Sequence, residues 1–203
     1  MIVRRSLCLA ALGAAVLLTG CDKLGFTSAP KASFQGVDLT GANYARTINL
    51  PDIDGKPRTL EDFKGKVVVV FFGYTQCPDV CPTTMAELAQ VKKALGADGD
   101  RVQGVFITVD PERDKPELLK VYLQSFDPSF VALRGSPEQI KETAKEFRVY
   151  YGKVPGKTPD SYTVDHIAAS FLFDPQGRVR VYARYGAGAQ PLMSDIKLLL
   201  AGQ

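Results

Sequence analysis

The residues of this sequence with the clearest capacity for chemistry are two cysteines in the middle of the chain and one histidine far beyond them. Cys77 and Cys81 are separated by three residues, and His166 is the only histidine among the 203 residues. Two thiolates select soft ions such as Cu(I), and an imidazole widens the range to Cu(II) or Zn(II). Two neighbouring thiols can also form a disulfide and exchange it with another thiol. The sequence therefore predicts a metal site, a redox pair, or both.

The spacing of the two cysteines leaves several interpretations open. A structural disulfide would close a very short loop, which gives only a modest entropic stabilisation, and its neighbours are proline and polar residues. The usual dithiol redox motif has two residues between its cysteines, whereas this chain has three. Residues 80–83 are similar to the peroxidatic turn of peroxiredoxins, but Pro78 or Tyr74 replaces the threonine expected three residues before the reactive cysteine. A metal site requires His166 to lie beside the two sulfurs.

The segments around the cysteines predict a strand, a turn and a helix. Residues 67–72 are an uninterrupted β-branched and aromatic run, which is typical of a fully buried strand. Residues 82–95 have an apolar stripe at helical spacing, and Pro82 suits the first turn of a helix. We therefore expect Cys81 at or beside a helix N-terminus, where the partial positive charge favours the thiolate over the thiol. Met85 belongs to the apolar stripe, so we interpret it as a core residue rather than a ligand.

The rest of the chain alternates between strand and helix patterns. This order predicts an α/β domain with a thioredoxin-like fold, in which a mixed central sheet is flanked by helices and preceded by an N-terminal β-hairpin extension. Residues 73–82, which contain both cysteines and which we call the cysteine turn, follow the first core strand. They lie at the edge where open α/β sheets commonly place their functional sites. Residues 151–163 contain several Gly and Pro residues, so we expect a long loop there. The other expected elements are a hairpin at 47–60, strands at 102–109, 130–133, 170–173 and 179–182, and helices at 116–126, 137–147 and 191–200.

Composition and charge argue against some classes of function. The formal net charge is only +3, and no basic cluster indicates a nucleic-acid partner. A single histidine excludes sites that need several imidazoles. The length suits one domain with additional segments.

The first residues predict export and attachment to a membrane. Arg4 and Arg5 precede an apolar stretch from 7 to 18, which is typical of a signal peptide and short for a transmembrane helix. Leu18-Thr19-Gly20-Cys21 resembles the lipobox of bacterial lipoproteins, which implies cleavage before Cys21 and lipid attachment to its sulfur. An ordinary signal cleaved nearby and an uncleaved anchor are the alternatives. The expected organisation is a lipoprotein signal peptide at 1–20, a lipidated cysteine and tether at 21–33, and the thioredoxin-like domain at 34–203.

Three segments together resemble the Sco/SenC family. They are FGYTQCPDVCPT at 72–83, ITVDPERD at 107–114 and VDH at 164–166, and the similarity runs from about Phe34 to the C-terminus. This resemblance implies a membrane-tethered, copper-binding, thioredoxin-like protein that helps to assemble the copper A centre of cytochrome c oxidase. It implies that copper, as Cu(I) or Cu(II), is bound by Cys77, Cys81 and His166. Asp165 is expected to orient the imidazole from outside the ligand set.

The resemblance also implies a function and partners. We expect a copper metallochaperone rather than a turnover enzyme, which receives copper from an upstream periplasmic donor and delivers it to the copper A-bearing subunit of cytochrome c oxidase. The runner-up is a thiol–disulfide reductase that keeps the copper-binding cysteines of that subunit reduced. A lipoprotein adaptor with an inert disulfide is the third interpretation. Because copper needs both sulfurs reduced, metal binding and a redox-active Cys77–Cys81 disulfide exclude each other.

Other parts of the family pattern lead to further expectations. Asp22, directly after the lipidated cysteine, resembles an inner-membrane retention signal, so we expect the protein on the periplasmic side of the bacterial inner membrane. Residues 110–114 are expected to form a loop that caps the helix beginning at Pro116, with partner docking as the alternative. Ile167 stands where a small hydroxyl residue is expected, and many relatives are held by an uncleaved helix instead of a lipid.

Overall fold

The computed structural model describes residues 33–158 and 161–203. The predicted signal peptide, the lipidation site Cys21 and the tether up to residue 32 lie outside the described residues. The part from Ser33 to Gln203 forms one compact unit. It contains a six-stranded sheet in the order β1-β10-β9-β4-β5-β6. These strands are β1 Val37–Asp38, β4 Val67–Gly73, β5 Val102–Thr108, β6 Val131–Leu133, β9 Ala169–Phe173 and β10 Val179–Arg184.

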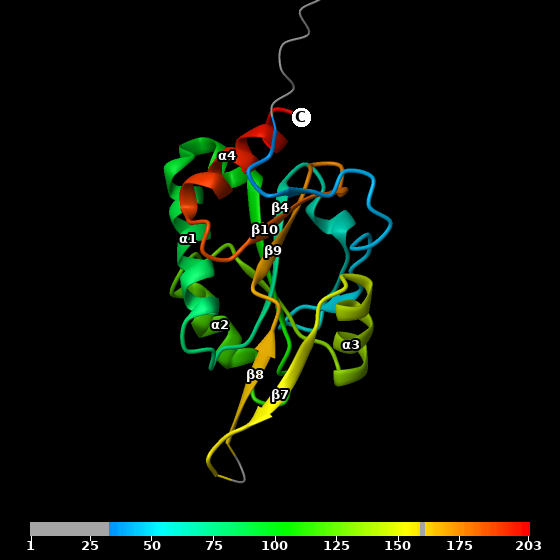
Figure 1. Cartoon of the computed structure of the whole chain (residues 1–203), viewed down its shortest axis with the longest axis vertical. Helices are drawn as coiled ribbons and strands as arrows, with labels where there is room; N and C mark the ends of the chain where they lie inside the picture. Colours follow the sequence, from blue (N-terminus) through cyan, green and yellow to red (C-terminus); the bar gives the residue numbers. More distant parts are fainter. Residues whose placement is uncertain (1–32, 159–160) are drawn as a thin grey trace, which may run out of the picture. The chain divides into compact units, whose positions relative to one another are not determined.

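Helices cover both faces of this sheet (Figure 1). The longest, α1 (Val80–Ala94), packs beside α4 (Ala189–Leu200), with α2 (Pro116–Gln124) on the same side, while α3 (Pro137–Glu146) lies on the opposite side. β4, β5 and β6 are parallel, and β9 and β10 are antiparallel. The predicted mixed sheet with flanking helices is therefore confirmed. The remaining elements are β2 Leu50–Pro51 paired with β3 Pro57–Arg58, β7 Tyr151–Pro155 paired with β8 Tyr162–His166, and the 3-10 helices at Leu60–Phe63 and Gly96–Arg101.

The centre of the domain is the parallel pair β4 and β5. All seven residues of each strand are buried. Strands that are covered on both faces carry apolar residues without alternation, which explains the continuous apolar run at 67–72. β4 ends at Gly73, and the chain then enters the cysteine turn at the sheet edge where β5 also ends.

Phe147, at the C-terminal end of α3, joins that helix to the sheet. Its ring centroid lies 5.2 Å from those of Phe72 and Phe171 and 6.1 Å from that of Phe173. All four rings are fully buried. The sequence patterns that begin this helix are confirmed as well: Ser136 and Gln139 form a capping box, in which each side chain bonds to the backbone of the other.

The expectation of a long loop at 151–163 is wrong. The segment forms most of a hairpin, in which β7 pairs with β8 from Tyr151 opposite His166 to Pro155 opposite Tyr162. Gly and Pro residues indicated a loop, but the ladder is made by backbone bonds to a partner strand, which local composition does not report. The hairpin is a two-stranded sheet of its own, separate from the central one, and places His166 at the end of a strand.

In the described part of the chain, no helix has both the length and the apolarity needed to cross a membrane. The longest helix there is α1, which has 15 residues and ends in two lysines followed by Ala94.

Substituting Phe147→Ala should lower the free energy of unfolding by about 3–5 kcal/mol, because it removes a fully buried ring from an aromatic cluster. The measurement is urea unfolding of residues 33–203 followed by circular dichroism. Val121→Ala is the matched control: Val121 is 67% exposed, and its substitution should change stability by no more than about 0.5 kcal/mol. Equal stability of the two variants would contradict the assigned core.

Candidate metal centre

The structure brings together the three residues that the sequence singled out. Cys77, Cys81 and His166 each offer one ligand atom, and these atoms all lie within 4.8 Å of one another. The Cys81 sulfur lies 3.4 Å from His166 Nε2. Within the described residues, this is the only group of three or more cysteine, histidine and acidic side chains whose ligand atoms lie close enough to bind one ion.

The cysteine turn is held by short-range bonds. The Cys77 amide donates to the Tyr74 carbonyl at 3.2 Å, and the Cys81 amide donates to the Cys77 sulfur at 3.4 Å. α1 begins at Val80, two residues earlier than predicted, so Cys81 lies within its first turn. The two sulfurs are consequently presented from the turn and from the helix start toward the same side.

Burial opposes ionisation of Cys81. Its side chain is fully buried, whereas Cys77 is half-buried. Burial, and next the contact with Cys77, raise the pKa of the Cys81 thiol well above its ordinary value. The expectation that the helix N-terminus makes Cys81 a ready thiolate is therefore wrong for the metal-free protein. Burial of the sulfur disfavours the charged form of the thiol, and it is the largest influence on the pKa of this group.

Gly73 makes this burial possible. A Cβ atom at that position would lie 2.9 Å from the Cys81 sulfur and 2.8–2.9 Å from ring atoms of Phe71 and Phe106. Carbon side-chain atoms do not approach so closely. A residue without a side chain is therefore required where β4 enters the cysteine turn.

His166 is held in the orientation that a ligand needs. Its ring meets the rings of Phe71 and Tyr74 edge-on, each at 5.9 Å between centroids. Nδ1 lies 3.1 Å from the Ile167 carbonyl oxygen, which can only accept, so Nδ1 carries the proton and Nε2 presents its lone pair toward Cys81. Burial lowers the pKa of the imidazole, which keeps the ring neutral at pH 7.

Asp165 does not hold the imidazole as expected. It is exposed, whereas the atom bonded to the ring is the Ile167 carbonyl oxygen. Successive residues of a strand point to opposite faces, so the carboxylate beside a ligating histidine is carried away from it. The charge of Asp165 raises the pKa of His166 only as a minor opposing influence.

The expected capping role of residues 110–114 is also wrong. The N-cap of α2 is Lys115, and it makes no side-chain cap bond. Asp114 is instead fully buried and accepts bonds from the Thr75 hydroxyl at 2.6 Å, the Thr75 amide at 3.2 Å and the Thr108 hydroxyl at 2.6 Å. The sequence reasoning missed this tie to the cysteine turn, although all three residues lie inside its singled-out segments.

The donor set suits a soft metal ion. Two sulfurs and a neutral imidazole nitrogen match the preferences of copper or zinc rather than those of magnesium or calcium. Metal–ligand bonds to sulfur and nitrogen are about 2.0–2.3 Å long. Ligand atoms around one ion therefore lie closer together than 4.8 Å, and the observed cluster needs only a small contraction to hold one.

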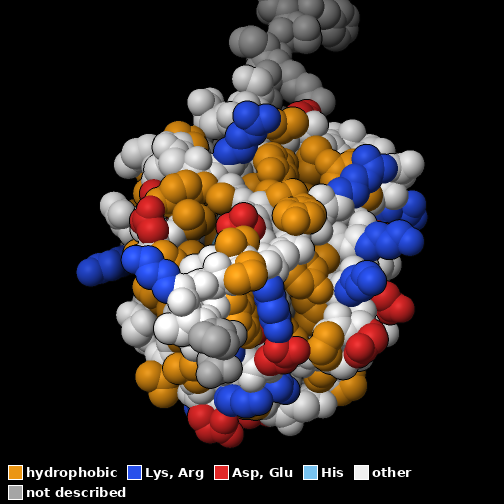
Figure 2. Space-filling model, turned by 60° about the horizontal axis from the view of Figure 1, so that its bottom comes forward, with side chains coloured by type: hydrophobic (Ala, Val, Ile, Leu, Met, Phe, Trp, Pro, Cys, Tyr) orange, Lys and Arg blue, Asp and Glu red, His pale blue; other side chains and the backbone are white. Residues whose placement is uncertain are grey.

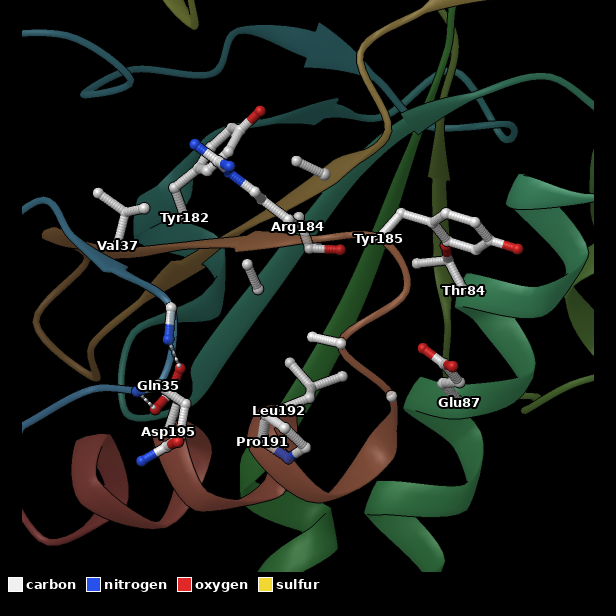
Figure 3. Close-up of a pocket in the computed structure, with 16 residues that line it drawn as sticks. Gln35, Val37, Thr84, Glu87, Tyr182, Arg184, Tyr185, Pro191, Leu192 and Asp195 are labelled. Atoms are coloured by element: carbon white, nitrogen blue, oxygen red, sulfur yellow. Dashed lines mark hydrogen bonds between the residues drawn. The ribbon is translucent and has the colours of Figure 1, made fainter.

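A pocket of about 420 Å³ lies apart from this cluster, between α1, α4 and β10 (Figure 3). Thr84 and Glu87 line it from α1, Leu192 from α4 and Tyr185 from the end of β10, and none of the three ligating residues takes part. Tyr185 donates to Asp79 of the cysteine turn at 3.3 Å. The cysteines and His166 therefore lie outside this pocket, although the pocket adjoins the cysteine turn through Tyr185.

Comparison with known proteins gives consistent matches. The SCO1/SenC family model matches residues 38–201. The mitochondrial SCO2 homolog of Mus musculus is 39% identical over 155 residues, which cover 75% of this chain and 61% of the mouse protein. The chain thus spans about six tenths of the length of that relative.

Solved structures match the same region. Bradyrhizobium japonicum ScoI with copper bound is 44% identical, with a TM-score of 0.68, and the match covers 76% of this chain and 98% of that one. BsSco, described as having a disulfide switch and as a member of the Sco family of cytochrome c oxidase assembly proteins, is 26% identical, with a TM-score of 0.62 and coverage of 84% and 99%. Because the solved chains consist almost entirely of the matched region, residues 33–203 are expected to fold on their own.

In reduced, metal-free protein of residues 33–203, iodoacetamide should modify Cys77 at least about 10-fold faster than Cys81. A tenfold difference in the thiolate fraction corresponds to a difference of about one pKa unit. Cys81 is fully buried and its thiol has a raised pKa, so it presents less of the reactive thiolate. Peptide mapping by mass spectrometry gives both rates. In guanidinium chloride the two rates should converge, and faster modification of Cys81 in the folded protein would contradict the site geometry.

Proposed function

Since the chain belongs to the SCO1/SenC family, we propose that it is a copper metallochaperone that delivers copper to the copper A site of cytochrome c oxidase. The observation that carries the proposal is the convergence of two sulfurs and one imidazole nitrogen within 4.8 Å. Copper bound to a related ScoI and the oxidase-assembly description of BsSco support this choice among the soft metals.

Each ligand has a separate part in the proposed binding. Cys77 and Cys81 supply thiolates, and copper releases the proton that the buried Cys81 holds in the metal-free state. His166 supplies a neutral Nε2, because the Ile167 carbonyl fixes the proton on Nδ1. Copper is the cargo here, and no bond of a substrate is made or broken.

Transfer to a partner requires access to the ion. Cys77 is half-buried, so its side of the cluster can be reached from outside. Tyr150 is 70% exposed, beside the hairpin that carries His166, and Val154 within that hairpin is 40% exposed. Figure 2 shows this end of the domain as a mixture of hydrophobic, basic and acidic side chains rather than a field of one sign. Such a surface suits a protein partner, which we take to be the copper A-bearing subunit, with a periplasmic copper donor upstream.

The proposed location is the periplasmic side of the bacterial inner membrane. The support is the signal-like segment at 1–20, the lipobox ending at Cys21, and Asp22 after it. Lipid attachment would hold the domain through a tether of about a dozen residues, which could span up to about 40 Å if fully extended.

Thiol–disulfide exchange with the oxidase subunit is the second candidate function. It is favoured by the closeness of the Cys77 and Cys81 sulfurs and by the disulfide switch described for BsSco. It requires the two cysteines but not the imidazole, so the two functions differ in their dependence on His166.

Reduced protein of residues 33–203 should bind one Cu(I) or one Cu(II) per chain, measured by titration with competing chelators. His166→Ala should lower the Cu(II) affinity by at least about 100-fold, more than the loss of a residue outside the ligand set usually causes. Cys77→Ser should abolish stoichiometric binding, and so should oxidation to the disulfide. Disulfide exchange should persist in the His166→Ala variant.

Asp165→Asn is the matched control, since Asp165 adjoins His166 but is exposed. It should leave both affinities unchanged. Preferential uptake of zinc by the parent protein would contradict the proposal, and oxidase assembly that survives His166→Ala but not Cys77→Ser would favour the reductase function instead.

A further inference from the structure

The side chain of Arg113 joins the two halves of the metal centre. Its Nη1 donates to the Gln76 amide oxygen at 3.2 Å and to the Tyr162 backbone oxygen at 2.8 Å. Gln76 directly precedes Cys77, and Tyr162 begins the strand that ends in His166. One guanidinium group therefore contacts both chain segments that must meet at the ion.

Several groups fix the plane of this guanidinium. Its carbon lies 3.6 Å from the centroid of the Tyr162 ring and 5.7 Å from that of the Tyr74 ring. Nε donates to Asp110, and the same carboxylate accepts the Tyr162 hydroxyl at 2.9 Å. Asp110 is fully buried, so this pair is screened little by solvent.

The hairpin needs such a fastening because it is not part of the central sheet. β7 and β8 form an isolated two-stranded sheet, and hairpins of this kind are marginally stable alone. The ion pair between Lys153 and Glu112 also ties the hairpin to the same loop, but both side chains are more than half exposed. Exposed ion pairs contribute little to stability. The buried contacts of Arg113 therefore attach the hairpin more strongly than this ion pair does.

The path from Arg113 to the ligand is short. Tyr74 lies under the guanidinium, and its ring meets the His166 ring edge-on at 5.9 Å. On the hairpin side, Tyr162 is four residues from His166 along one strand. A shift of either tyrosine would therefore change the direction of Nε2.

We propose that Arg113 is a positioning residue, which holds the His166 imidazole beside the Cys77 and Cys81 sulfurs without touching the ion. The significance of this role for copper rests on the function proposed above, whereas the placement of the ring does not. Lysine cannot replace it, since an ammonium lacks the planar fork that bonds several acceptors and stacks on an aromatic ring.

The first test needs no metal. His166 is the only histidine of the chain, so its ring signals are unambiguous. In the metal-free protein of residues 33–203, nuclear Overhauser contacts between the His166 and Tyr74 rings should be strong in the parent and lost in Arg113→Ala and Arg113→Lys. Tyr162→Phe, which removes only the hydroxyl bond to Asp110, should weaken them.

The second test uses copper. Both Arg113 variants should bind one Cu(I) through the two sulfurs, while their Cu(II) affinity should fall about 10- to 100-fold, as is typical for residues that orient a ligand. The electron paramagnetic resonance spectrum of Cu(II) should also lose coupling to the imidazole nitrogen.

Arg180→Ala is the matched control. Arg180 likewise contacts a carboxylate, a hydroxyl and an aromatic ring, namely Asp174, Thr40 and Phe34, but none of these belongs to the metal centre. It should lower thermal stability without changing ring contacts or spectra. Folded Arg113 variants with parental ring contacts would overturn the proposal. If ring contacts are lost but the parent protein binds no copper, the positioning role stands and the proposed function fails.

Discussion

The burial of the Cys81 sulfur is the constraint on which the rest of the site depends. A Cβ atom at Gly73 would meet both this sulfur and two aromatic rings, and a neutral imidazole nitrogen lies 3.4 Å from the sulfur. In such surroundings an isolated thiolate is costly, so the thiol keeps its proton until a cation takes its place. Proton release and metal capture are then a single event, and the site favours ions that bind sulfur strongly enough to offset the desolvation.

Two separate sets of contacts hold the ligands of the site, and both are made by the segment between β5 and α2. The cysteine turn is continuous with the buried strand β4, and the carboxylate of Asp114 fastens it through Thr75. The histidine arrives on a separate hairpin, and the neighbouring residue Arg113 fastens that hairpin through Tyr162. Adjacent residues of the segment between β5 and α2 thus hold opposite sides of the metal centre. This gives the segment a structural role that is unrelated to capping α2.

Local patterns predicted the parts of the site that local interactions create. The apolar run at 67–72 and the helical stripe after it were sufficient to place Cys77 in the turn after β4 and Cys81 at the start of α1. The hairpin at 151–166 was not predictable in this way, because its ladder joins residues whose own composition indicates a loop. The raised pKa of Cys81 and the bonds of Asp114 depend on neighbours far away in the sequence, so a rule about helix ends could not account for them.

The unequal attachment of the ligands bears on how an ion would be held and released. The two sulfurs come from one continuous strand-to-helix unit, whereas the imidazole comes from a hairpin outside the central sheet. Cu(I) is satisfied by two soft sulfurs, while Cu(II) gains more from an additional nitrogen. A displacement of His166 from the two sulfurs would therefore weaken the binding of Cu(II) more than that of Cu(I). For a carrier, this arrangement separates retention, which the sulfurs provide, from the choice of oxidation state, which the position of His166 adjusts.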